Sequence, residues 1–191
     1  TDRSRGLGDV YKRQEGPEMS GLFKKRLDDS AESRMEHPAS KSWIFFTFLL
    51  AFVLCIVFGE IFWAPDFVAL TLIFWTLREP DRVGFLTAFI CGILMDALFG
   101  TVLGQQSLAY VTLCYLTFAL SRRLPSFDLF GQSLHILPVL LISQLFVMLV
   151  RLWFDGLWPG WEWFLASVTG ALLWGIWTKL LTPRALRSAS L

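Results

Sequence analysis

Six apolar segments follow one another along most of the chain, and they restrict the possible folds more than any other feature. The segments are residues 43–63, 67–77, 83–99, 104–120, 134–153 and 163–181. A helix that crosses a bilayer needs about 20 mostly apolar residues, with a range of ~17–25. Charged residues make up only 17% of the chain, whereas soluble domains contain about 25%. We therefore predict an all-α polytopic membrane protein with six transmembrane helices.

The second segment, residues 67–77, is short for a membrane span. Pro65 can begin a helix at its first turn, and Pro80 prevents that helix from continuing far. We predict a short span that forms a tight hairpin with the first one. An interfacial or re-entrant helix is the alternative.

Positive charge tests this count, because the cytoplasmic loops of membrane proteins are enriched in Lys and Arg. Basic residues occur before residue 43, at Arg78 and Arg82, at Arg122 and Arg123, and at Lys179, Arg184 and Arg187. The other connections, residues 64–66, 100–103 and 155–162, contain no Lys or Arg. Six spans with both termini in the cytoplasm place every basic connection on the cytoplasmic side and every connection without Lys or Arg on the other side. If the second segment did not cross, later basic loops would lie on the wrong side.

The polar ends of the chain differ in composition from this central region. Residues 1–42 are rich in charged residues and Ser, which predicts a disordered cytoplasmic tail. Residues 1–14 resemble translated adapter or vector sequence, and Met35 is a plausible true start. We expect a six-helix membrane domain over residues 43–182 and a cytoplasmic C-terminal tail over residues 183–191.

A stripe of small residues runs along the third segment. Gly84, Ala88, Gly92, Asp96 and Gly100 follow one another at a spacing of four, and Gly104 continues the series. Residues four apart share one face of a helix, and small residues let neighbouring helices approach closely in a membrane. The stripe predicts a helix-packing face, with a partner-binding face as the alternative.

Asp96 is the polar member of this stripe. It follows Arg82 by 14 residues, or roughly 21 Å of helix, which places it in the outer leaflet. A charged group at that depth is expected to face the bundle and to have a partner. We predict that Arg151, at a similar depth, pairs with Asp96 or with Asp155. Asp96 can also cap the turn into Gly100.

Trp158 and Trp161 lie in the connection before the last segment. Tryptophans gather at membrane interfaces, so we predict that these two anchor the neighbouring helices there.

The sequence contains no set of residues that indicates an enzyme. Its two histidines, His37 and His135, lie outside any GxSxG, HExxH or paired-aspartate motif, and no Walker A loop occurs. The three cysteines stand alone, without metal-ligand spacing. The net charge of +1 does not favour nucleic-acid binding. We predict a non-enzymatic protein without a cofactor or metal.

The central block resembles a known family. The stretches "PDFVALTLIFWTLREPDRV" and "GILMDALFGTVLG" carry Pro65, Trp75, Pro80, Arg82, Val83, Gly92, Asp96, Gly100, Leu103 and Gly104. Their spacing, together with the six-segment pattern, resembles MreD, the bacterial rod shape-determining membrane protein. The resemblance covers about residues 40–182.

The resemblance implies a scaffold of the cell-elongation machinery in the bacterial inner membrane. MreD-like proteins are associated with MreC and, directly or through it, with MreB, RodA and a class B penicillin-binding protein. The implied role is to support lateral peptidoglycan synthesis and rod shape. We expect MreC to dock on the small-residue stripe, on the "FGTVLGQQS" turn at residues 99–107, or on the Trp-rich connection.

The family is also thought similar in fold to the S components of vitamin transporters. A small-molecule transporter or S-component-like vitamin-binding protein is therefore the alternative function. It would need a polar pocket, and the residues that can line one are Glu60, Asp96, Gln105, Gln106 and Arg151.

Overall fold

The computed structural model describes residues 40–59, 61, 63–121, 128–156, 158 and 160–182. Its α-helices are α3 (Lys41–Phe58), α4 (Phe67–Arg78), α5 (Phe85–Phe99), α6 (Gln105–Leu120), α7 (Leu129–Asp155) and α8 (Leu165–Leu181), with a 3-10 helix η2 (Trp161–Phe164) before α8. The described residues contain no strand, so the all-α class is confirmed. Nearly all of the predicted N-terminal tail and the predicted C-terminal tail lie outside the described residues.

The six helices match the six predicted segments, but α7 starts earlier than its predicted segment. It begins at Leu129, five residues before the predicted boundary, and runs for 27 residues. The Asp128 side chain caps it by accepting a hydrogen bond from the Gly131 N–H. Because the first turn is less apolar than the rest, hydropathy alone placed the start too late. Pro138 lies inside this helix.

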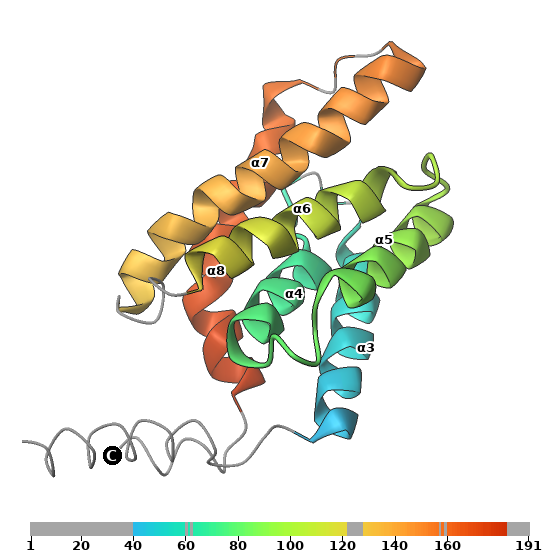
Figure 1. The fold of residues 1–191 in the computed structure, drawn as a ribbon. Coiled ribbons are helices and arrows are strands. Elements are labelled where there is room, and N and C mark those ends of the chain that lie inside the picture. Colours follow the sequence, from blue (N-terminus) through green and yellow to red (C-terminus); the bar gives the residue numbers. More distant parts are fainter. Residues whose placement is uncertain are drawn as a thin grey trace, which may run out of the picture. The chain divides into compact units, whose positions relative to one another are not determined.

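Helix α4 lies at the centre of the bundle. All residues from 68 to 76 are buried, and the helix contacts α3, α6 and α8, as Figure 1 shows. A helix that is apolar on all sides is typical of a buried core element. The short span and its interfacial or re-entrant alternative both stay predictions.

Three polar contacts tie α4 to its neighbours. The Trp75 indole N–H donates to Thr47 of α3 over 2.9 Å, and the Trp177 indole N–H of α8 donates to Thr71 over 3.2 Å. Thr76 lies 3.4 Å from the Cys114 sulfur of α6. Such hydrogen bonds between helices stabilise membrane bundles, where apolar contact alone does not distinguish protein from lipid.

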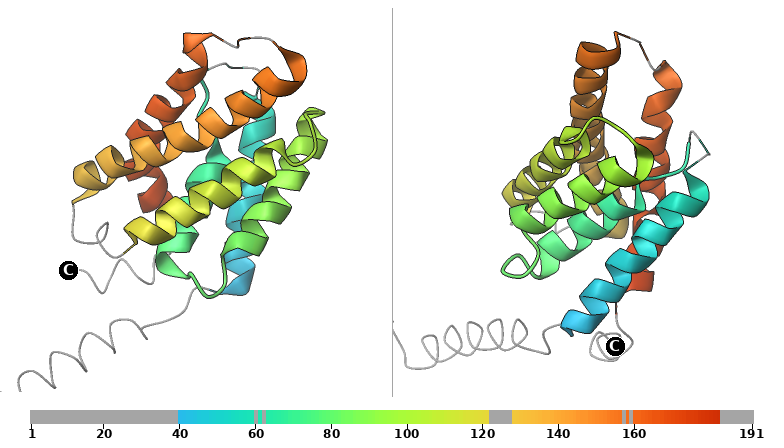
Figure 2. Two further views of the ribbon diagram at one scale, coloured as in Figure 1. Left: turned by 45° about the horizontal axis from the view of Figure 1, so that its top comes forward. Right: turned by 90° about the vertical axis from the view of Figure 1, so that its right-hand side faces the viewer.

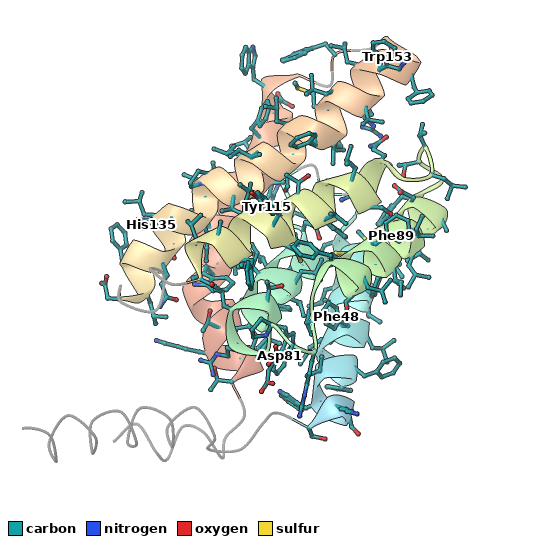
Figure 3. All side chains as sticks on the ribbon, in the orientation of Figure 1. Phe48, Asp81, Phe89, Tyr115, His135 and Trp153 are labelled. Carbon is teal, nitrogen blue, oxygen red and sulfur yellow. The ribbon has the colours of Figure 1, made fainter. Side chains whose placement is uncertain are left out.

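The bundle of residues 40–182 has two distinct ends. The Trp43 indole N–H donates to the Leu181 carbonyl over 3.1 Å, so α3 begins where α8 ends. We call this the terminal end. The connections α3–α4, α5–α6 and α7–η2 lie at the opposite end, which we call the loop end (Figure 2). In Figure 3, Asp81 marks the terminal end and Trp153 the loop end.

Three stretches are long and apolar enough to cross a membrane: Lys41–Phe58, Leu129–Phe154 and Trp161–Leu181. Helices α4 and α5 are apolar but shorter. Large apolar side chains cover the outside of the bundle, among them Leu86, Leu94, Leu172 and Ile176, each about half exposed or more. This surface fits insertion into a membrane.

Candidate functional site

Helices α5 and α6 pack against each other at the small-residue stripe. Ala88 and Gly92 are buried. A Cβ atom on Gly92 would lie 2.2 Å from the Cα of Ser107, which is closer than any side chain can approach. The stripe therefore packs inside the molecule. At these two residues the structure agrees with the predicted helix-packing face, because both are buried and Gly92 lies against α6. Docking of MreC stays a prediction.

The two outer glycines of the predicted stripe do not lie on the helix. Gly84 is the N-cap of α5 and Gly100 its C-cap. Gly100 has a φ of 62° and Gly104 a φ of 96°, in the left-handed region that glycine adopts without strain. Together they turn the chain from α5 into α6. The residues in the middle of the series thus form a packing face on α5, and Gly84 and Gly100 mark the two ends of that helix.

Asp96 holds this turn together. One carboxylate oxygen accepts from the Thr101 hydroxyl over 2.7 Å and from the Gln106 N–H over 3.0 Å. The other accepts from the Gly104 N–H over 2.9 Å and from the same Gln106 N–H over 3.2 Å. The positive end of the α6 dipole favours a carboxylate here. We call Asp96, Thr101, Gly104 and Gln106 the Asp96 network.

Arg151 does not pair with Asp96, so that predicted ion pair is wrong. Its guanidinium lies 4.8 Å from the centre of the Trp163 ring, in a cation–π contact. The network satisfies Asp96 through backbone and hydroxyl donors instead. The alternative pair, Arg151 with Asp155, involves a side chain outside those that the structure describes, and it stays a prediction.

A cavity of about 370 Å³ opens near the loop end, lined by residues from α3, α4, α5, α6, α7 and α8. Of the residues predicted to line a pocket, Gln105, Gln106 and Arg151 do so and Asp96 does not. Glu60 lies outside the described residues. The volume is within the range of small-molecule sites.

Asp66 lies on one wall of this cavity, and sequence analysis missed it as a site residue. Its carboxylate accepts from the Ala69 N–H at the start of α4 (2.9 Å), from the Tyr110 hydroxyl (2.7 Å) and from the Gln106 amide (3.3 Å). Cys55 lies 3.9 Å away. An aspartate directly before an apolar run is typical of a helix cap, which Asp66 is. The contacts with α6 depend on tertiary structure, so no local signal reveals them.

The opposite wall comes from α7, η2 and α8. The Gln144 amide donates to the Trp163 carbonyl over 3.2 Å, and its oxygen accepts from the Ser167 hydroxyl. Arg151 and the Trp163 ring border the cavity beside this pair. A polar wall therefore faces the Asp66 wall across the mostly apolar lining of the cavity.

A second hollow, of about 460 Å³, lies on the outside between the α5–α6 turn and the end of α7. We call it the α5–α7 groove, and its lining is Phe89, Val102, Leu103, Gly104, Gln105, Ser107, Leu108, Val111, Val150 and Phe154. Most of these side chains are apolar, and the groove includes much of the "FGTVLGQQS" turn.

Trp158 and Trp161 lie at the loop end, where their rings meet edge to face at 5.4 Å. They are 48% and 79% exposed, so about half of Trp158 and most of Trp161 is available to lipid or to a partner. Among the described residues, no group of three or more His, Cys, Asp or Glu side chains is placed to hold a metal ion.

The fold and these sites define an all-helical membrane protein whose buried polar residues fix a turn and line a cavity. The family model for the rod shape-determining protein MreD matches residues 39–183. The MreD protein of Haemophilus influenzae is 28% identical over 153 residues, which cover 76% of this chain and 94% of that protein. No solved structure matches. The chain belongs to the MreD family of rod shape-determining proteins, which confirms the resemblance found in the sequence and supports a role in cell shape.

Proposed function

We propose that this protein is a non-enzymatic scaffold of the elongation machinery in the bacterial inner membrane. In this role it binds MreC and, directly or through it, works with MreB, RodA and a class B penicillin-binding protein in lateral peptidoglycan synthesis. The observation that carries the proposal is the family match, which extends over the whole helical bundle. The family description is that of a shape-determining protein rather than of an enzyme.

The proposed topology has six spans with both termini in the cytoplasm. The shared end of α3 and α8 supports it, because Trp43 and Leu181 are in direct contact. Arg78, Arg82 and Lys179 also belong to the terminal end, where the positive-inside rule expects basic residues in the cytoplasm. The loop end then faces outward, and Trp158 and Trp161 anchor it at the outer interface.

We place the MreC contact in the α5–α7 groove rather than on the buried stripe. The groove is apolar and open to the membrane, so a single apolar helix can pack against it. Leu108 of α6 lines it and is 47% exposed. The Asp96 network fixes the turn that forms one side of the groove. Asp96, Gly100 and Gly104 thus affect the partner through the shape of the turn.

Co-purification tests this contact. Leu108→Trp puts a large ring into the groove and is expected to reduce the amount of MreC recovered with the tagged protein by tenfold or more. Leu172→Trp is the matched control, since Leu172 is 75% exposed on α8 and lines neither hollow. Equal recovery of MreC with both variants, at equal expression, would show that the groove is not the contact.

The alternative function, a transporter or vitamin-binding protein, gains no support from the comparisons. We do not propose it.

A further inference from the structure

Around the cavity near the loop end, the hydrogen-bond acceptor on one wall is already used, whereas donors elsewhere are not. On the Asp66 wall, the carboxylate already accepts from three donors and lies beside Cys55. A carboxylate has about four acceptor sites, so Asp66 has little capacity for a further donor. Its need for a cationic partner is correspondingly small.

The other groups around the cavity have donors to spare. The Trp163 indole N–H is buried and has no hydrogen-bond partner among the described residues. Arg151 presents a guanidinium with five N–H donors, which lies over the Trp163 ring. Of its two carboxylate partners predicted from the sequence, Asp96 is engaged elsewhere, and the side chain of Asp155 lies outside those that the structure describes. A buried donor without an acceptor is costly, so the Trp163 N–H, with the partly buried Arg151 beside it on the cavity lining, points to an acceptor from outside the chain.

The remaining lining limits what that acceptor is attached to. Leu140, Val147, Met95 and Phe99 line the cavity and offer no hydrogen bond. A free inorganic ion would leave this apolar surface uncovered. An anionic head on an apolar body satisfies both parts, with the head at Arg151 and Trp163 and the body along the apolar wall.

We propose that this cavity binds an amphipathic anion, with its carboxylate or phosphate group held by Arg151 and the Trp163 N–H. The same chemistry is present in an anionic membrane lipid and in a soluble carboxylate or phosphate ester. The site is separate from the α5–α7 groove, which Arg151 and Trp163 do not line. The proposal is therefore independent of the MreC contact.

Thermal unfolding of the purified full chain in neutral detergent, followed by far-ultraviolet circular dichroism, tests the proposal. A ligand that binds only the folded state raises the unfolding midpoint. The probes are phosphatidylglycerol in mixed micelles, phosphatidylcholine as the neutral lipid, and octanoate and octyl phosphate as soluble anions. A rise with phosphatidylglycerol alone identifies a lipid as the source of the anion. A rise with the soluble probes alone identifies a soluble ligand, and either result supports the site.

Variants distinguish this site from a general effect of negative charge. Arg151→Gln should weaken binding roughly ten- to a hundredfold, because a hydrogen bond to a charged group is lost. Arg78→Gln is the matched control, since the Arg78 guanidinium also lies 4.8 Å over an aromatic ring, that of Phe74, away from the cavity. Trp163→Phe keeps the ring under Arg151 and removes only the N–H, so it should also weaken binding. This variant tests the site even if Arg151→Gln fails to fold. No rise with any anion, or an equal rise in the wild type and in Trp163→Phe and Arg151→Gln, would overturn the proposal.

Discussion

Replacement of Asp96 by alanine should strongly destabilise the bundle. The change removes both carboxylate oxygens and leaves the Thr101 hydroxyl and the N–H groups of Gly104 and Gln106 without their acceptor. Asp96 is 1% exposed, so water does not readily replace it. Hydrogen bonds to charged groups contribute ~1.5–3 kcal/mol each, but such losses are not additive. We expect the free energy of unfolding to fall by about 3 to 5 kcal/mol, because each buried donor left without an acceptor costs ~1–3 kcal/mol.

Two more conservative substitutions separate the effect of the Asp96 charge from the effect of its individual hydrogen bonds. Asp96→Asn keeps one acceptor oxygen but turns an NH2 group toward backbone donors, so it should cost nearly as much as alanine. Thr101→Val removes one donor and leaves the carboxylate bound to both backbone N–H groups. Its cost should be about 1.5 to 3 kcal/mol, the contribution of one hydrogen bond to a charged group.

The assay is reversible unfolding in mixed micelles by titration with dodecyl sulfate, with helix content as the signal. Asp81→Ala is the control, since Asp81 is an exposed aspartate in the α4–α5 connection. Exposed substitutions usually change stability by less than about 0.5 kcal/mol. If Asp96→Ala unfolds at the same denaturant fraction as Asp81→Ala, the Asp96 network does not stabilise the turn and the reasoning is refuted.

Two further predictions concern packing and topology. Gly92→Ala should destabilise the protein by about 2 to 3 kcal/mol, because its new methyl group meets the α6 backbone. Gly175→Ala, in the same unfolding assay, should leave stability equal or raise it, since nothing lies within 4 Å of its Cβ position; similar losses would contradict the close approach. For topology, Trp158→Cys should react with a membrane-impermeant maleimide in spheroplasts and Asp81→Cys only after lysis, while the native cysteines are buried. The reverse order would contradict the proposed orientation.

The helices could be predicted from the sequence because a lipid-exposed bundle needs long apolar runs. Their ends could be predicted less well, since they depend on caps such as Asp128 rather than on hydropathy. The role of Asp96 was only partly predictable. Depth along the helix suggested Arg151 as its partner. Its actual donors are two backbone N–H groups and the Thr101 hydroxyl, which come together only once the α5–α6 turn has formed.

The cavity was harder to predict for a related reason. The sequence predicted that Gln105, Gln106 and Arg151, which are polar residues near apolar runs, can line a pocket, and all three line the cavity. Asp66 and Tyr110 come from segments 44 residues apart in the chain and meet only in the folded bundle. Their separate sequence contexts, a helix cap and an aromatic residue in an apolar run, each have an ordinary explanation.

Cell shape is the most direct test of the proposed function. In cells of the source bacterium depleted of their own copy, the wild-type protein and Leu172→Trp should restore rods. Leu108→Trp, expressed at the same level, should leave the cells round because MreC no longer binds in the groove. Rods in all three strains would contradict the groove as the partner site, and round cells with the wild-type protein would contradict the role in shape itself.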